Sequence, residues 1–273
     1  MRLQRAPTPP VATVEALDLP GPAGPIPCRA YTPSEPGPRP LIVFLHGGGW
    51  TAGDLDTHDA VCRRLCAAAG AVVLALGYRL APEHPFPAAW DDAWAALACA
   101  AENAGSLGAD PARLVLAGDS AGATLAAACA ARARDEGGPC VALLLLICPI
   151  LDIAGESASR RAFARGWFVD AAAIAQDLAW TLPPGADPAD PRVSPVRAPS
   201  LAGLPPTLVH VAEYDPFRDE GLAYAAALRE AGGAAQATTH PGMMHFFHAL
   251  PRSIPYAADA LERIGREVRR MLE

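Results

Sequence analysis

The sequence predicts one α/β domain in which a mostly parallel sheet carries helices on both faces. Short apolar runs typical of buried strands alternate with helical patterns from residue 41 onwards, as in parallel, doubly wound sheets. The chain has 273 residues, 51% of them hydrophobic, which is enough for one large core. The third observation is the segment GDSAG at residues 118–122, which joins an apolar run to an Ala-rich helical pattern. Residues 1–273 are therefore expected to form a single domain.

The expected elements follow one another in a regular order. Two short strands, 11–17 and 26–31, lie among Pro- and Gly-rich clusters before the alternation begins. The later strands are expected at residues 41–45, 71–76, 113–117, 141–147, 207–213 and 235–239. The helices are expected at residues 57–69, 87–103, 120–134, 218–231 and 254–272.

The alternation lapses over residues 152–204. Two short helical patterns, near 157–165 and 170–181, precede a Pro-rich stretch. An insertion at the carboxyl edge of a parallel sheet lies over the site that such sheets build there. We therefore expect residues 152–204 to form a small helical cap.

Charge and hydropathy exclude several classes of partner. The formal net charge of −7 and the dispersed arginines argue against a nucleic-acid partner. No apolar run is long enough for a membrane span, and the N-terminal stretch lacks a signal-peptide core. Seven irregularly spaced cysteines are typical of reduced thiols. Cys62 and Cys66 are one helical turn apart and could share a metal, but no second ligand pair accompanies them. We expect a cytoplasmic protein without a metal.

The GDSAG segment has the spacing of a nucleophile elbow, G-x-S-x-G at a strand-to-helix turn. A turn sharp enough to lift Ser120 above the sheet brings backbone segments so close that Gly118 and Gly122 must lack a Cβ. The first free N–H groups of the helix, above all that of Ala121, then point to where negative charge would develop. The alternative is a serine N-cap between two chance glycines, so the context must decide.

A serine nucleophile needs a base, and the base needs an orienting carboxylate. Asp215 follows the strand 207–213, whereas its competitors Glu213 and Asp219 belong to the strand and to the following helix. The loop position favours Asp215, because open α/β sheets place their sites at the carboxyl ends of strands.

Two histidines compete for the role of the base. His245 lies in a loop after the strand 235–239, and His240 ends that strand but precedes a proline. The longer reach of the loop favours His245, although the residue pattern alone leaves His240 open. His210, inside a strand, and His248, near the last irregular segment, are expected to be packing or surface residues.

A Gly-rich turn supplies the remaining requirement, charge stabilisation. The segment HGGGW at residues 46–50 directly follows the strand 41–45, where backbone N–H groups can point at an oxyanion. We assign Gly48 and Gly49 to this oxyanion hole, with Ala121 as the third donor. A purely structural Gly-rich loop is the alternative.

Five motifs in this order make the chain resemble the bacterial hormone-sensitive-lipase family of carboxylesterases, which has the α/β-hydrolase fold. The motifs are HGGGW (46–50), YRLAPEHPFPAA (78–89), GDSAG (118–122), EYDPFRDE (213–220) and HPGMMHFF (240–247). The resemblance implies the triad Ser120, Asp215 and His245, with Gly48, Gly49 and Ala121 as the oxyanion hole. It favours His245 over His240 and implies a structural YRLAPE motif. It also implies no cofactor or metal, and a possible homodimer paired through the last strand and helix.

The chain departs from the family pattern in three places. Ala123 and Thr124 stand where the family usually has Gly-Asn, a change that a helix tolerates. Phe246 replaces the Gly that usually follows the catalytic His, and its ring could narrow the site. Only about ten residues precede the first strand, where relatives carry helices of the cap, so we expect a wider, more open site.

The combined expectation is a serine carboxylesterase that hydrolyses short- to medium-chain esters through an acyl-enzyme. Two alternatives remain: an amidase with the same triad, and a hydrolase-fold protein that binds a small molecule without turnover.

Overall fold

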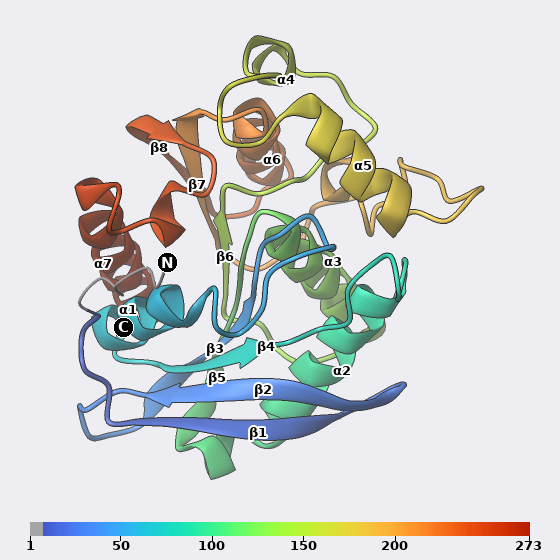
Figure 1. Ribbon diagram of the computed structural model, residues 1–273. Coiled ribbons are helices and arrows are strands. Elements are labelled where there is room, and N and C mark those ends of the chain that lie inside the picture. The colour runs from blue at the N-terminus through green and yellow to red at the C-terminus, as the bar shows by residue number, and fades with distance from the viewer. Residues whose placement is uncertain (1–7) are drawn as a thin grey trace.

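The computed structural model describes residues 8–273 and contains one eight-stranded sheet (Figure 1). The strands lie in the order β1-β2-β4-β3-β5-β6-β7-β8. β1 and β2 form an antiparallel hairpin on β4, and β3 to β8 are mutually parallel. The strands are β1 (Thr13–Gly21), β2 (Gly24–Thr32), β3 (Arg39–Leu45), β4 (Val72–Leu76), β5 (Ala109–Asp119), β6 (Leu143–Ile147), β7 (Thr207–Tyr214) and β8 (Ala235–Met244). This is the α/β-hydrolase arrangement that the sequence predicts.

Helices cover both faces of the sheet. α1 and α7 contact each other on one face, and α2, α3 and α6 pack on the other (Figure 1). The helices are α1 (Asp59–Ala69), α2 (Ala88–Glu102), α3 (Ala121–Glu136), α4 (Ala158–Ala162), α5 (Ala171–Thr181), α6 (Arg218–Glu230) and α7 (Pro255–Leu272). Short 3-10 turns are η1 (Ala104–Leu107), η2 (Pro195–Arg197) and η3 (Phe247–Ala249).

The central strands are buried on both faces, which explains their continuous apolar runs. In β3, Leu41, Val43 and Leu45 join the core beneath α2 and α3, while Ile42 and Phe44 join the core beneath α1 and α7. Successive side chains of a strand point to opposite faces. Each residue from Leu41 to Leu45 therefore contributes to one of two cores.

Every expected strand and helix is present, and β5 and β8 extend furthest beyond their predicted bounds. β5 begins at Ala109, where it pairs with Arg39 of β3. β8 continues to Met244, which pairs with Tyr214 beyond a register shift. Both extensions contain a proline and polar residues, which propensity assigns to loops. His240 therefore lies inside β8 rather than at its end.

The turn between β5 and α3 has the strained geometry that the G-x-S-x-G spacing requires. Ser120 has φ 51°, in the left-handed region. A Cβ on Gly118 would overlap the carbonyl of Gly122, and a Cβ on Gly122 would overlap the carbonyl oxygen of Leu45. The two glycines thus permit α3 to start directly against the end of β3.

The 152–204 segment divides into two parts. α4 and α5 lie above the carboxyl ends of the parallel strands (Figure 1). The later part returns to the core, where Val193 is buried and η2 contacts α3 and α6. Only the first part is therefore placed to cover a site.

No helix within residues 8–273 is both long and apolar enough to cross a membrane.

We expect Gly122→Ala to lower the free energy of unfolding by more than about 3 kcal/mol, because backbone must move to admit the new methyl group. Urea unfolding measures the change. Gly105→Ala is the matched control, since a Cβ there meets no atom within 4 Å, and it should change stability by less than about 1 kcal/mol. Equal stability of both variants and the wild type would contradict the steric role of Gly122.

Candidate active site

Ser120, His245 and Asp215 form one hydrogen-bonded line at the carboxyl ends of β5, β8 and β7. His245 Nε2 lies 2.9 Å from Ser120 Oγ, and His245 Nδ1 lies 2.8 Å from Asp215 Oδ2. The exposed fractions are 5%, 3% and 0% for Ser120, His245 and Asp215. A serine, a base and an orienting carboxylate are thus arranged for proton transfer from the hydroxyl.

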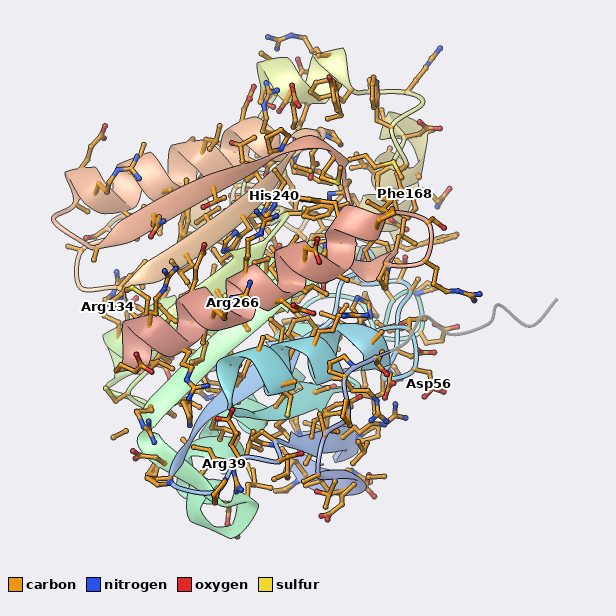
Figure 2. All side chains as sticks on the ribbon, turned by 90° about the vertical axis from the view of Figure 1, so that its left-hand side faces the viewer. Arg39, Asp56, Arg134, Phe168, His240 and Arg266 are labelled. Carbon is orange, nitrogen blue, oxygen red and sulfur yellow. The ribbon has the colours of Figure 1, made fainter. Side chains whose placement is uncertain are left out.

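The rival residues have other partners. His240 (labelled in Figure 2) has its Nε2 3.2 Å from His210 Nδ1 and its Nδ1 3.0 Å from the Tyr256 hydroxyl. Glu213 accepts a hydrogen bond from the Gly242 N–H, and Asp219 accepts one from the Ser159 N–H. None of these contacts leads to Ser120.

Asp215 sets the protonation behaviour of His245. Burial by itself lowers the pKa of His245, but the charge and hydrogen bond of Asp215 outweigh burial, so the pKa is raised above its ordinary 6.5. Asp215 is in turn held by the Phe217 N–H, which donates to Asp215 Oδ1 at 2.8 Å. The imidazole is therefore fixed in the orientation that presents Nε2 to the serine.

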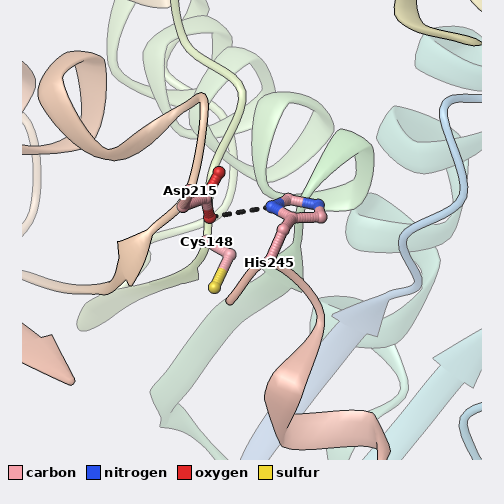
Figure 3. A group of neighbouring side chains, drawn as sticks. All are labelled: Cys148, Asp215 and His245. Carbon is pink, nitrogen blue, oxygen red and sulfur yellow. Dashed lines mark hydrogen bonds and ion pairs between the residues drawn. The ribbon is translucent and has the colours of Figure 1, made fainter. Parts of the chain in front are cut away.

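Cys148 lies beside this pair (Figure 3). Its sulfur, a carboxylate oxygen of Asp215 and a ring nitrogen of His245 all lie within 4.8 Å of one another. Burial, and then the charge of Asp215, raise the pKa of the Cys148 thiol well above its usual range. The thiol is thus protonated at neutral pH. The cluster therefore consists of the His245–Asp215 pair with a neutral thiol packed beside it.

The HGGGW loop comes directly off β3 and faces Ser120. Gly48 and Gly49 have φ values of 128° and 63° and line the same cavity as Ser120. The Tyr78 hydroxyl donates to the His46 carbonyl at 2.6 Å. Arg79 forms an ion pair with the buried Asp92 at 2.7 Å. The motif that contains Tyr78 and Arg79 therefore supports the loop and takes no part in the cavity.

Asp119 connects the loop to the elbow, and sequence reasoning missed this role. It is fully buried, and its Oδ1 accepts the Gly47 N–H at 2.9 Å. His58 Nε2 and His248 Nε2 lie 3.3 and 3.2 Å from its carboxylate oxygens. A carboxylate next to the nucleophile, inside an otherwise apolar strand, was the available signal, because buried charges need partners. His248, expected to be a packing or surface residue, is buried against this carboxylate.

The charges of this cluster are mutually dependent. Burial by itself raises the pKa of Asp119, but His58 and His248 outweigh it and hold the pKa well below its usual range. Burial lowers the pKa of His58, and the Asp119 charge outweighs that effect, so the pKa of His58 is raised. Asp119 is thus an anion that depends on its histidine partners.

A mostly apolar cavity of about 370 Å³ opens above Ser120. The HGGGW loop forms one wall, and side chains from residues 150–178 form another. Phe246 and Phe168 stack on each other at a ring separation of 5.5 Å and an angle of 14°, and both line the cavity. The Phe246 ring thus forms part of the cavity wall, next to Phe168. The expectation of a wider, more open site stays a prediction.

Comparison with known proteins decides the family. The sequence matches the alpha/beta hydrolase fold family over residues 42–249. The chain belongs to the hormone-sensitive-lipase-like family of α/β-hydrolases. Thr124, one of its departures from the family pattern, donates its hydroxyl to the Ile150 carbonyl at 2.6 Å, so the fold accommodates the change within a buried helix.

Several relatives of this chain are esterases by name. The carboxylic ester hydrolase LipN of Mycobacterium tuberculosis is 48% identical over 244 residues, which are 86% of this chain and 64% of LipN. Carboxylesterase NlhH of the same organism is 43% identical over 245 residues, 87% of this chain and 76% of NlhH. The structure of an ester hydrolase from the metagenome of Lake Arreo has a TM-score of 0.94 at 42% identity and covers 97% of this chain and 85% of that one. The present chain thus spans less than two thirds of the length of LipN.

We expect Asp119→Ala to lower the free energy of unfolding at neutral pH by about 3–5 kcal/mol, because His58, His248 and the Gly47 N–H lose their shared acceptor. Thermal or urea unfolding measures the loss. A depressed pKa stabilises the folded state above the unfolded value of 3.8, so the difference between wild type and variant should shrink as the pH falls below about 4.

Asp135→Ala is the control for this prediction. Asp135 forms an exposed ion pair with Arg134, and its loss should leave the free energy of unfolding nearly unchanged. An Asp119→Ala protein as stable as the control variant would show that the cluster contributes little.

Proposed function

We propose that the protein is a serine carboxylesterase that hydrolyses short- to medium-chain carboxylic esters through an acyl-enzyme. The observation that carries this proposal is the Ser120–His245–Asp215 line beneath an apolar cavity of about 370 Å³. Ester hydrolysis needs an activated hydroxyl and room for an acyl or alcohol group. The names of the esterase relatives support the same reaction.

In the proposed mechanism, Ser120 Oγ attacks the ester carbonyl while His245 Nε2 takes its proton. Asp215 stabilises the imidazolium that forms, and His245 then gives the proton to the leaving alcohol oxygen. Water repeats the sequence on the acyl-enzyme: His245 takes a proton from water, the hydroxide oxygen bonds to the acyl carbon, and Ser120 leaves with the proton. The raised pKa of His245 supports its role as a base near neutral pH.

The oxyanion is proposed to rest on the N–H groups of Gly48, Gly49 and Ala121. Ala121 begins α3, so its N–H is free of an intrahelical partner and lies at the positive end of the helix dipole. The glycines line the cavity beside Ser120. The loss of one such donor typically costs about 10²–10³ in turnover.

We further infer that the first part of residues 152–204, which carries α4 and α5, acts as the cap of the single domain, with α5 as its main wall over the cavity. A cytoplasmic location is supported by the seven free cysteines, because thiols stay reduced there. A homodimer paired through β8 is supported by the place of this strand at one edge of the sheet. Light scattering in solution tests the dimer.

Hydrolysis of p-nitrophenyl esters from acetate to long acyl chains tests the function. We expect the wild type to turn over the short and medium chains, since the cavity is small, and Ser120→Ala to lose several orders of magnitude in kcat/KM. Circular dichroism shows that the variant is folded. Wild-type inactivity on every chain length would instead favour the binding protein, and faster hydrolysis of a matched anilide would favour the amidase.

The pH dependence tests the role of His245. The imidazole must be neutral to accept a proton, so kcat/KM should rise with pH through the raised pKa of His245, and the midpoint of the acid limb should lie above 6.5. Asp215→Asn removes the charge that raises this pKa. We expect it to move the limb to lower pH and to reduce kcat/KM by about 10³–10⁴. A limb that is unmoved by Asp215→Asn would assign the titration to another group.

A further inference from the structure

Asp177 places a carboxylate in the wall of the cavity. It lies on α5, and its Oδ1 accepts a hydrogen bond from the Thr51 hydroxyl at 2.7 Å. A Cβ on Gly49 would overlap Asp177 Oδ2, so this oxygen touches the loop that is proposed to hold the oxyanion. The carboxylate therefore faces the reacting end of the cavity.

This carboxylate has no cationic partner within the described part of the chain. Of the titratable side chains that line the cavity, His58 belongs to Asp119 and His245 belongs to Asp215. Partial burial raises the pKa of Asp177, the Thr51 hydrogen bond lowers it, and no arginine contributes. Asp177 is the only carboxylate among the described residues that line the cavity.

An unpaired anion beside an oxyanion hole is unfavourable for a neutral substrate. It repels the negative charge that develops on the carbonyl oxygen and places a partly desolvated charge in an apolar wall. A positive group on the substrate removes both costs.

We propose that Asp177 makes this enzyme selective for esters that carry a cationic group, such as a quaternary ammonium, close to the scissile carbonyl. The proposal rests on the esterase function proposed above and names its substrate class. Asp177 is a specificity-determining residue here, and it takes no part in proton transfer.

Two isosteric substrate pairs measure this selectivity on either side of the ester bond. Acetylcholine is compared with neohexyl acetate, in which a carbon replaces the charged nitrogen of the alcohol. The p-nitrophenyl ester of γ-trimethylammoniobutyric acid is compared with its carbon isostere for the acyl side. The quantity measured is the ratio of kcat/KM, cationic over neutral, within each pair.

Three variants separate the charge from the hydrogen bond. Asp177→Asn keeps an oxygen for the Thr51 hydroxyl and removes the charge, whereas Thr51→Val removes the hydrogen bond and keeps the charge. Glu156→Gln removes one charge from an exposed position of the same segment that does not line the cavity.

We expect Asp177→Asn to lower the ratio roughly tenfold for at least one pair, the size of one charge pair in a partly solvated pocket, with neutral-ester hydrolysis unchanged or faster. Thr51→Val and Glu156→Gln should keep the wild-type ratio. The proposal is overturned if Asp177→Asn leaves both ratios unchanged, or if it slows cationic and neutral esters equally, as a merely structural contact would. If the wild type hydrolyses neutral esters and Ser120→Ala does not, the esterase function holds even when the Asp177 proposal fails. If the wild type does not hydrolyse neutral esters, the esterase function is rejected.

Discussion

The close contact between the start of α3 and the end of β3 is the constraint on which the site depends. Because neither Gly118 nor Gly122 carries a Cβ, the helix begins against the carbonyls of Leu45 and His46. This contact places the Ser120 hydroxyl, the first free N–H of α3 and the Gly-rich loop around one point. Asp119 then ties the loop to the elbow through the Gly47 N–H. Backbone contacts and one buried anion thus fix the position of Ser120 relative to the Gly-rich loop.

The part of the site that could be predicted from the sequence follows from strand ends. In a parallel sheet, the residue that follows each strand lies at the same edge, that of the carboxyl ends. The positions of Ser120, Asp215 and the HGGGW loop could therefore be predicted from the apolar runs together with the G-x-S-x-G spacing and the Gly-rich turn. The choice between His240 and His245 needed the family resemblance, because the residue pattern assigned the polar extension of β8 to a loop.

The contacts that could not be predicted join residues that no local pattern relates. Asp177 and Thr51 are 126 residues apart, and Asp119 meets histidines from the start of α1 and from η3. These residues are close because of the positions of α5 and α1 relative to the sheet. Those positions depend on the packing of many side chains. A carboxylate inside an apolar strand indicates only that it needs a buried partner. The pattern does not indicate which histidine or hydroxyl is that partner.

In the stacked pair Phe168 and Phe246, the stability of the fold conflicts with the shape of the cavity. Both residues have left-handed backbones, with φ values of 73° and 64°, a conformation that costs a bulky residue on the order of 1–3 kcal/mol. Glycine at either position would relieve this strain but would remove a ring from the cavity wall. Selection of this protein for thermal stability alone would thus favour glycine at these positions and remove the rings that line the cavity. Improvement of both properties requires stabilising changes elsewhere in the fold.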